Sequence, residues 1–536
     1  MKFFVTRFIK IEQYHLNNWT LRVLEQAAYF FRNSGSQAYL VGGSVRNLLL
    51  HEPCNDWDIV TNGDYLKLGR QLANELGGYY APMHEKACRI IVKHDQQELV
   101  IDLSPLQGGS IEADLQLRDF TLNAIAIPLV NLVEHLTANE TLTFIDPMNG
   151  VADLEAHILR AVNDRVFRDD PLRLLRAMRF LMRYQLTLES QTEQMTTRDA
   201  SLLSQVAGAR IHEELYTILQ PAGATAQLRF LDGHGLLTAL IPEFIPARGM
   251  PQPALHYWDV LEHSLESVGA LERLATLLQQ TPLEATSQTQ TQHACDLSPS
   301  VGTPIDYQNF VSVGESWEDL MEIQQLLFEA EQQDIFHFST LTAPVTKLAT
   351  LLHDIGKPVT YAVNEEGTIT FYHHPQRGIP LAQAITQRLN ASVRDRRLVQ
   401  QIVAHHMRPG QLKYDQLTER AIRRYFVDLG PTGIIVALVS LADHLAMRGP
   451  QPLTEHWEGH LATVRLLLTR YIRERKRILP PRLIQANELM QRFNLEPGPI
   501  VGQVLESIAE QQADGHLQSK EEAFWFIEET FDMRRV

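Results

Sequence analysis

The chain has 536 residues, enough for several domains that each bury a core. Hydrophobic residues make up 44% and charged residues 21%, which is ordinary for a soluble globular protein. No apolar run reaches membrane-spanning length, and the N-terminus lacks a signal-peptide cleavage site, so we expect no membrane segment and no leader. The net charge of −16 excludes a protein that coats nucleic acid along its whole surface, but it permits a local basic groove.

The three cysteines, Cys54, Cys88 and Cys295, indicate the compartment. They are too few for a disulfide framework and do not have zinc-site spacing. We therefore expect a reducing, cytoplasmic location.

The first predicted elements surround a glycine pair. Residues 20–33 have helical periodicity, and the apolar run 38–41 predicts a buried strand that ends at Gly42-Gly43. Ser44 is predicted to cap a helix over residues 45–50, and residues 56–60 predict a second strand. Side chains alternate along a strand, so we expect Asp56 and Asp58 on the same face.

This stretch combines two kinds of binding group. Paired glycines let the backbone approach a ligand closely, and the following helix N-terminus offers free N–H groups to phosphate. Adjacent carboxylates suit a divalent cation, and Mg²⁺ favours a few carboxylates together with substrate phosphates. A phosphate cradle beside a carboxylate pair is typical of nucleotidyl transfer.

Further strands and motifs follow along the chain. We expect a helix over residues 64–76 and strands over residues 87–93 and 98–103. Asp102, near the end of the last strand, is either a third carboxylate of the metal site or a surface residue, and the pattern does not decide between them. A loop at residues 146–150 leads to a helix predicted to begin at Asp153.

An arginine-rich helix is predicted within the stretch 165–184, beginning at Pro171. Asp170 is its predicted cap and Pro171 fits its first position. Arg173, Arg176 and Arg179 are spaced three apart and therefore lie on one stripe, which is cationic.

These motifs carry a family resemblance. The stretch 39–60 resembles the LVGG-x-VRD-x-LL…D-x-D signature of polymerase-β-like nucleotidyltransferases, specifically bacterial class II tRNA nucleotidyltransferases and poly(A) polymerases. Residues 110–127 resemble the EDL-x-RRDFT-x-NA motif of that family. Three positions depart from the family pattern: Asn47 replaces Asp, Leu117 replaces Arg, and Asp169 replaces Glu.

The resemblance implies an α+β fold, with a nucleotidyltransferase head built on a small mixed sheet and then an all-α neck, an HD domain and a helical tail. It implies two Mg²⁺ ions on Asp56 and Asp58, which align the tRNA 3′-hydroxyl and the α-phosphate of CTP or ATP. It assigns Asp119 to the sugar or to Arg118. The residues that it implies for the triphosphate and nearby nucleotide groups are Gly42, Gly43, Ser44, Arg46, Arg118 and Asn123.

The same resemblance assigns Asp169, Asp170 and Arg173 to base reading, with Arg176 and Arg179 beside them. Cytosine and adenine both offer an amino donor beside a ring-nitrogen acceptor, which Asp and Arg can answer together. Uracil and guanine present a carbonyl instead. One pair of side chains can therefore accept CTP and ATP without a nucleic-acid template.

A second set of residues suits a metal site. A His-Asp doublet with distant histidines and an aspartate is a fit ligand set for a divalent ion, although histidines on apolar helices are commonly core residues. The order H…HD…H…H…D resembles the HD phosphohydrolase superfamily. The resemblance implies one metal ion, of unstated identity, on His263, His353, Asp354 and Asp443. It also implies a second ion or phosphate on His374 and either His405 or His406, with a metal-activated water attacking a phosphoester.

The remaining segments complete the predicted organisation. Residues 283–314 are rich in Ser, Thr, Gln and Pro and are predicted to be a loosely attached insertion. The tail resembles a tRNA-contacting region and carries a basic run: Arg470, Arg473, Arg475, Lys476, Arg477 and Arg482. The expected domains are a helical extension (1–36), the head (37–150), a neck and body (151–248), the HD domain (249–450) and the tail (451–536).

Three functional hypotheses remain open on this evidence. The first is addition of CCA, or of only CC or only A, to tRNA. By resemblance, the short segment between Asp102 and Arg118 favours an enzyme that adds only CC or only A. The second is a poly(A) polymerase, which shares the head motifs. The third is an HD phosphohydrolase whose head only binds RNA.

Overall fold

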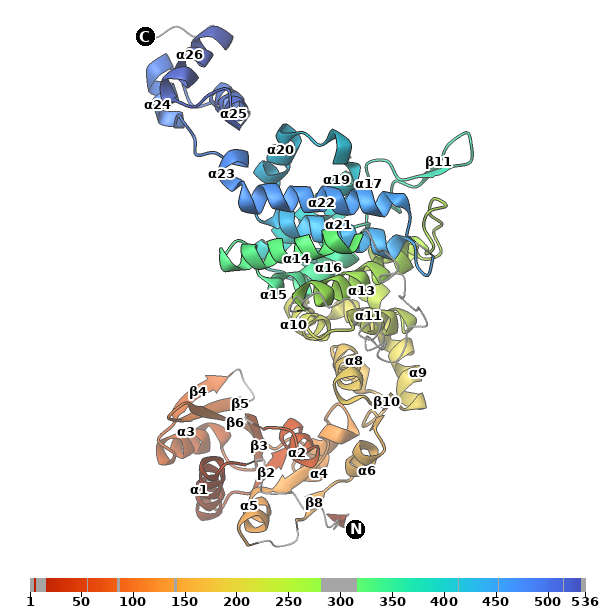
Figure 1. The fold of residues 1–536 in the computed structure, drawn as a ribbon. Helices are drawn as coiled ribbons and strands as arrows, with labels where there is room; N and C mark the ends of the chain where they lie inside the picture. Colours follow the sequence, from red (N-terminus) through yellow and green to blue (C-terminus); the bar gives the residue numbers. More distant parts are fainter. Residues whose placement is uncertain are drawn as a thin grey trace, which may run out of the picture. The chain divides into compact units, whose positions relative to one another are not determined.

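The computed structural model describes residues 4–5, 16–54, 56–83, 87–138, 142–280, 316–412, 414–451, 453–513 and 515–531. The predicted insertion at 283–314 lies outside this part of the chain. The chain divides into two compact units, Met1–Val206 with His234–Ala239, and Ala207–Gly233 with Leu240–Val536. The α+β fold class is confirmed, because the first unit contains a mixed sheet and the second is almost entirely helical (Figure 1).

The sheet of the first unit has the strand order β1-β8-β7-β2-β3-β6-β5-β4. Its strands are β1 (Phe4–Val5), β2 (Ala38–Val41), β3 (Asp56–Thr61), β4 (Tyr79–Met83), β5 (Ala87–His94), β6 (Gln97–Pro105), β7 (Ala126–Pro128) and β8 (Phe144–Ile145). Strands β3 and β6 are parallel, with Asp58 opposite Asp102. Strand β5 is antiparallel to β6 and places Arg89 opposite Asp102. The register therefore brings one cation and two carboxylates together.

The helices of the first unit are α1 (Asn18–Ser34), α2 (Gly43–Leu49), α3 (Tyr65–Glu75), α4 (Ile111–Gln116), α5 (Leu129–Ala138), α6 (Gly150–Glu155), α7 (Val166–Asp169), α8 (Arg173–Tyr184), α9 (Ser190–Asp199) and α12 (Leu236–Leu240). Short 3-10 turns lie at η2 (Thr121–Asn123) and η3 (Ala200–Gln205), and a two-stranded ladder pairs β9 (Ile158–Leu159) with β10 (Thr187–Leu188).

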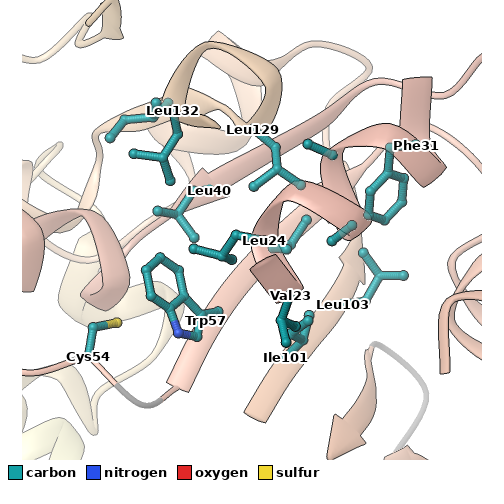
Figure 2. Packing of buried hydrophobic residues seen from close by; sticks show 14 of the residues in the cluster. Val23, Leu24, Phe31, Leu40, Cys54, Trp57, Ile101, Leu103, Leu129 and Leu132 are labelled. Carbon is teal, nitrogen blue, oxygen red and sulfur yellow. The ribbon is translucent and has the colours of Figure 1, made fainter. Parts of the chain in front are cut away.

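The main core of this unit lies on the sheet face opposite the two aspartates. Figure 2 shows side chains of α1, β2, β3 and α5 meeting in this core, with Leu24, Leu40 and Trp57 at its centre. Trp57 is completely buried there. Because side chains alternate along β3, Asp56 and Asp58 lie on the other face, as predicted. Helix α1 contributes to the same core, which joins part of the predicted N-terminal extension to the head.

The second unit is a set of packed helices. Figure 1 shows α13 (Val260–Gln279), α14 (Ser316–Gln332), α21 (Thr432–Met447) and α22 (Glu455–Arg473) side by side. The other helices are α10 (Gly208–Leu219), α11 (Ala224–Gly233), α15 (Phe338–Leu341), α16 (Pro344–Leu351), α17 (His374–Arg388), α18 (Val393–His405), α19 (Arg408–Gln411), α20 (Glu419–Leu429), α23 (Arg475–Ile478), α24 (Ala486–Phe493), α25 (Pro499–Ala513) and α26 (Lys520–Thr530). The 3-10 turns η4 (Pro242–Ala247) and η7 (Tyr414–Gln416) and the strands β11 (Ala362–Val363) and β12 (Ile369–Thr370) complete the unit.

One buried ion pair ties two connections of this unit together. The Lys347 ammonium donates to the carbonyls of Leu219 and Pro221, at 2.8 and 2.7 Å, and lies 2.7 Å from a Glu272 carboxylate oxygen. Glu272 also accepts from the Ala224 N–H at the start of α11. The pair therefore satisfies the polar groups of the turn between α10 and α11.

No single helix of the described residues is long and apolar enough to cross a membrane. One bent pair, Glu419–Leu429 with Thr432–Met447 at 106°, meets the criteria of length and composition only when joined.

The predicted local elements are largely present, with two corrections. The strands expected at 38–41, 56–60, 87–93 and 98–103 and the helices expected at 20–33 and 64–76 all form. The prediction that Ser44 caps α2 is wrong, because its hydroxyl donates to the Asp56 carbonyl and accepts from the Asp58 N–H at 2.7 Å. The helix expected to begin at Asp153 begins at Gly150, whose N–H donates to Asp146.

Candidate active sites in the head and the HD domain

A pocket of about 530 Å³ opens beside the glycine turn in the first unit. The sequence-predicted residues that line it are Gly42, Gly43, Asp58, Asp102, Arg118, Asp119, Asn123, Arg173 and Arg176. The predicted residues outside its lining are Asp56, Ser44, Arg46, Asp169, Asp170 and Arg179. The pocket thus brings together residues from six separate elements and loops.

Two carboxylates lie side by side in this pocket. Asp58 and Asp102 are neighbours across β3 and β6. Burial, and then the negative charge of Asp102, raise the pKa of Asp58 to about 6. A cation placed here would relieve both effects, which makes the pair a fit site for a divalent ion with oxygen ligands.

Arg89 is a residue beside this site that sequence reasoning missed, as it also missed Asp114. Its Nε and Nη2 donate to the two Asp102 oxygens at 2.8 and 2.7 Å. This bidentate pair fixes the orientation of Asp102. Asp102 is therefore a pocket residue that is already bound by an arginine. The sequence signal would have been the β5–β6 register, which cannot be read from local patterns.

Gly42 is where the site converges. Its φ of +66° lies in the left-handed region. A Cβ at this position would lie 2.9 Å from Arg118 Nη1 and 3.7 Å from Asp58 Oδ2. Only glycine therefore combines this backbone with the approach of Arg118 and Asp58.

Arg118 is held in place by a buried carboxylate. Asp114 Oδ1 accepts from Arg118 Nη2 at 2.9 Å and from Nε at 3.2 Å, and its other oxygen accepts from the Gln107 N–H at 3.0 Å. The Asp114 side chain is 6% exposed and that of Arg118 is 23% exposed. One end of the guanidinium is thus fixed, while Nη1 faces Gly42.

Asp119 is the centre of a second polar network. Its Oδ1 accepts from the Phe120 N–H at 2.8 Å and from Asn123 Nδ2 at 2.9 Å, and its Oδ2 lies 3.0 Å from Arg176. Asn123 Oδ1 in turn accepts from Arg46 Nη1 at 2.8 Å. This network joins α2, the η2 turn and α8.

Arg46 faces this network instead of the pocket. It is buried, donates to Asn47 Oδ1 at 2.9 Å, and lies over the rings of Tyr184 and Phe180 at 4.7 and 5.2 Å. Asn47, which departs from the family pattern, therefore serves as a neutral acceptor for this guanidinium. Arg46 therefore connects α2 to α8 through its contacts with these rings.

The predicted base-reading residues are divided by the structure. Arg173 lines the pocket and donates to the Leu117 carbonyl at 3.0 Å. Asp169 lies 3.4 Å from Arg165. Asp170 accepts from the Leu172 N–H at 3.2 Å in the turn before α8, but the N-cap of α8 is Leu172 and no side chain caps it, so the prediction that Asp170 is the cap is wrong. Arg179 lies over the Phe180 ring at 5.0 Å and is outside the pocket lining.

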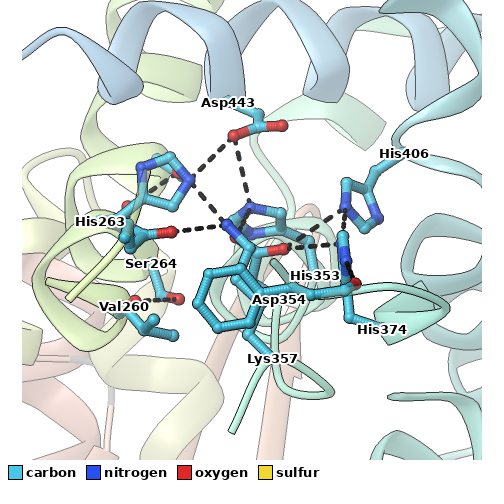
Figure 3. A network of polar contacts seen from close by, with 12 residues as sticks. Val260, His263, Ser264, His353, Asp354, Lys357, His374, His406 and Asp443 are labelled. Carbon is cyan, nitrogen blue, oxygen red and sulfur yellow. Dashed lines mark hydrogen bonds and ion pairs between the residues drawn. The ribbon is translucent and has the colours of Figure 1, made fainter. Parts of the chain in front are cut away.

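The second unit contains a cluster of buried histidines and aspartates, which Figure 3 shows converging from separate helices. His263 Nε2 lies 2.9 Å from Asp443 Oδ1. His353 and His374 lie 3.2 Å from the two different oxygens of Asp354. His406 Nε2 lies 3.3 Å from His374 Nε2. Asp354 therefore stands between two groups of histidines.

The histidines are oriented so that they can bind a cation. The Nδ1–H groups of His353, His374 and His406 donate to backbone carbonyls, at 2.7, 2.9 and 3.0 Å. This fixes the proton of the neutral imidazole on Nδ1 and points the Nε2 atoms at the cluster. Three overlapping triads of these residues have ligand atoms within 4.8 Å of one another. Such a nitrogen and oxygen donor set fits a divalent metal ion.

The charges of the cluster are balanced within it. Burial favours the neutral form of Asp354, but His353 and Lys357 hold the pKa of its carboxyl well below the ordinary value. Lys357 Nζ lies 2.6 Å from Asp354 Oδ2. Between the two predicted histidines at the end of α18, His406 belongs to the cluster and His405 does not.

The basic run of the tail is partly neutralised. Arg470 and Arg477 both pair with Glu419 and Glu474, and Arg473 lies 2.7 Å from Glu329. Arg475 lies over the Tyr471 ring at 5.1 Å. The run is therefore less cationic than its sequence indicates.

Comparisons with known proteins match the order of these elements. The Poly A polymerase head domain matches residues 38–108 and 92–160, the probable RNA and SrmB-binding site of polymerase A matches residues 185–248, and the HD domain matches residues 337–448. The A-adding tRNA nucleotidyltransferase of Deinococcus radiodurans is 29% identical over 92% of this chain and 95% of its own length. The chain is similar along nearly its whole length to tRNA nucleotidyltransferases, and it contains a Poly A polymerase head domain and an HD domain.

A second tRNA nucleotidyltransferase and a solved structure are similar to this chain along almost their whole length. The CC-adding tRNA nucleotidyltransferase of Thermus thermophilus is 29% identical over 91% of this chain and 93% of its own. A solved structure of a CCA-adding enzyme with CTP has a TM-score of 0.61 at 19% identity and covers 99% of this chain and all of that one. The latter likeness shows that the fold is shared.

Proposed function

We propose that this protein is a tRNA nucleotidyltransferase that adds CMP, AMP or both to tRNA 3′ ends from CTP and ATP, without a nucleic-acid template. The observation that carries the proposal is that Asp58, Asp102 and Arg118 line one pocket with Gly42, which Asp58 and Arg118 both approach closely. Relatives similar over nine-tenths of the chain are named for adding A or CC to tRNA. We place it in the cytoplasm, because Cys54 and Cys88 are free thiols.

The predicted metal and triphosphate residues have the following proposed roles, with Asp56 outside the pocket lining but two residues before Asp58 on β3. Asp56 and Asp58 would hold Mg²⁺, which supplies positive charge at the transferring phosphate and lowers the pKa of the attacking 3′-hydroxyl. Gly42 and Gly43 let the triphosphate approach the backbone, and Arg118 Nη1 pairs with its oxygens. In-line attack by the 3′-oxygen on the α-phosphate then forms one phosphodiester bond and releases pyrophosphate.

The base-reading residues are proposed to act together when nucleotide binds. Arg173 lines the pocket, whereas Asp169 and Asp170 lie outside its lining. The exposed Arg165–Asp169 pair is weak and can open at small cost.

The proposed tRNA contacts of the tail are Arg475 and Lys476, because their three basic neighbours, Arg470, Arg473 and Arg477, are paired with carboxylates. Replacing both with Ala should weaken tRNA binding and reduce its salt dependence.

The test is nucleotide incorporation on a series of tRNA substrates. Transcripts lacking the terminus or ending in C, CC and CCA are incubated with labelled CTP or ATP. Extension of the CC end by one A identifies an A-adding enzyme, and extension of the truncated end by two C residues identifies a CC-adding enzyme. Long ATP-only tails on unrelated RNA would instead identify a poly(A) polymerase.

A second activity is proposed for the HD cluster, namely metal-dependent hydrolysis of phosphoesters. The fixed Nε2 atoms around Asp354 and Asp443 favour it, because they present a ready ligand set. Asp354→Asn should abolish hydrolysis of 3′-phosphorylated RNA and lower the bound-metal content, while nucleotide incorporation stays within twofold of the parent. Hydrolysis that survives this change would contradict the assignment.

A further inference from the structure

A β-hairpin connects two members of the HD cluster. Strands β11 and β12 lie between Lys357 and His374, and Figure 1 shows the hairpin projecting from the helices. Both of its ends are fixed at the cluster, since Lys357 Nζ lies 2.6 Å from Asp354 and His374 Nε2 lies 3.2 Å from the same carboxylate. The base of the hairpin is therefore at the cluster.

Two aromatic rings form the base of this hairpin. Ala362 pairs with Thr370, so Tyr361 and Phe371 are the next cross-strand pair toward the cluster. Their ring centroids are 5.9 Å apart. Lys357 Nζ lies 5.5 Å from the Phe371 ring centroid, and the Phe371 carbonyl accepts from His374 Nδ1. One chain of contacts thus runs from Tyr361 through Phe371 and Lys357 to Asp354.

This ring pair is placed and exposed as a base-binding surface would be. Tyr361 is 40% exposed, although the polar cluster at the base of its hairpin is mostly buried, with the Asp443 side chain 21% exposed. The two steps from the Phe371 ring to Lys357 and on to Asp354 span 5.5 and 2.6 Å. Along this chain of contacts, Lys357 alone stands between the Phe371 ring and Asp354. Aromatic side chains bind unpaired bases by stacking, with little dependence on which base is present.

We propose that Tyr361 and Phe371 form a base-stacking subsite of the HD site, which therefore takes nucleoside 3′-phosphoesters in preference to phosphoesters without a base. The inference rests on the proposed hydrolase activity and names its substrate class. In the reaction, a water oxygen bonds to phosphorus as the bond to the 3′-oxygen breaks. The water gives a proton to solvent, and the leaving oxygen takes one up.

The test compares two phosphates of secondary alcohols, adenosine 3′-phosphate and glycerol 2-phosphate, with the full-length protein. Loss of one stacked ring is worth about 1–3 kcal/mol, so Tyr361→Ala should raise KM for the nucleotide by about tenfold. The KM for glycerol 2-phosphate should change by less than about twofold, and Tyr361→Phe should behave as the parent, because stacking needs the ring and not the hydroxyl.

Tyr372→Ala is the matched control. Tyr372 is 76% exposed and follows Phe371 in the turn that leads to α17, and it is not part of the Tyr361–Phe371 ring pair. It should leave both KM values unchanged. Equal KM increases for both esters in Tyr361→Ala would overturn the proposal. A 3′-phosphorylated oligoribonucleotide distinguishes an RNA end from a free nucleotide as the substrate. A KM below that of the mononucleotide indicates an RNA end, and an equal KM indicates free nucleotides.

A second measurement separates this inference from the hydrolase assignment. If the protein hydrolyses neither ester, the proposed activity fails, but the subsite is still tested by photolabelling with 8-azidoadenosine 3′-phosphate. Label within residues 358–373, lost in Tyr361→Ala, supports the subsite. No label in that segment overturns it.

Discussion

Removing the Asp114 carboxylate should disable the head without unfolding it. Asp114 accepts two hydrogen bonds from Arg118, at 2.9 and 3.2 Å, from a side chain that is only 6% exposed. Hydrogen bonds to charged groups contribute about 1.5–3 kcal/mol each. We expect Asp114→Ala to cost about 2–3 kcal/mol of transition-state binding, which lowers kcat/KM for nucleotide by about 30- to 150-fold.

The assay is single-nucleotide incorporation into tRNA by a double-mutant cycle with Arg118→Ala. Asp114 acts through Arg118, so the combined variant should be no slower than Arg118→Ala alone. Asp114→Asn, which keeps one acceptor oxygen, should lie between. The control is Glu98→Ala, which breaks the exposed Lys93–Glu98 pair, where an ion pair contributes about 0–1 kcal/mol. Additive losses in the cycle, or an Asp114→Ala rate within threefold of the parent, would refute the reasoning.

Three further outcomes are expected. Gly42→Ala should reduce nucleotide incorporation more than about tenfold. A left-handed backbone costs a non-glycine residue about 1–2 kcal/mol, and the new Cβ would lie 2.9 Å from Arg118. Hydrolysis by the HD domain, measured as the control, should not change. The pKa of Asp58 is raised to about 6, so protons compete with the metal for this carboxylate below that pH. The Mg²⁺ concentration for half-maximal incorporation should therefore rise as the pH falls from 7 to 5. A Mg²⁺ requirement that does not change with pH would contradict this. Lys347→Met leaves the part-buried Glu272 without its cation and should lower the free energy of unfolding of the second unit by about 3 kcal/mol in urea titrations. An unchanged midpoint would show the pair to be dispensable.

Short-range patterns predicted the elements around the glycine turn well. The strand at 38–41, the turn and the strand at 56–60 follow from local hydrophobicity and the glycine pair. Strand alternation alone places Asp56 and Asp58 on one face of β3 and Trp57 on the other. The position of Ser44 failed for a physical reason. A hydroxyl at the first turn of a helix has a competing partner when a strand edge is near, and the β3 backbone provides one.

Contacts between distant segments could not be read from the sequence. Arg89 meets Asp102 only through the β5–β6 register, and Arg46 turns inward because aromatic rings of α8, more than 130 residues away, cover it. His405 and His406 are neighbours on one helix and project about 100° apart, so only the packing of α18 decides which joins the cluster. The charge of the tail run was also misleading, because its carboxylate partners lie on α14 and α20.

The central claim is that the pocket holding Asp58 transfers nucleotides to tRNA. Its most direct measurement is incorporation of labelled CMP and AMP into tRNA lacking all or part of CCA, by the parent and by Asp58→Asn. The parent should extend at least one of these substrates. Asp58→Asn should raise the activation free energy by about 4 kcal/mol or more, which lowers the incorporation rate about a thousandfold or more, with HD hydrolysis unchanged. A variant that extends tRNA at the parental rate, or a parent that extends none of the substrates, would contradict it.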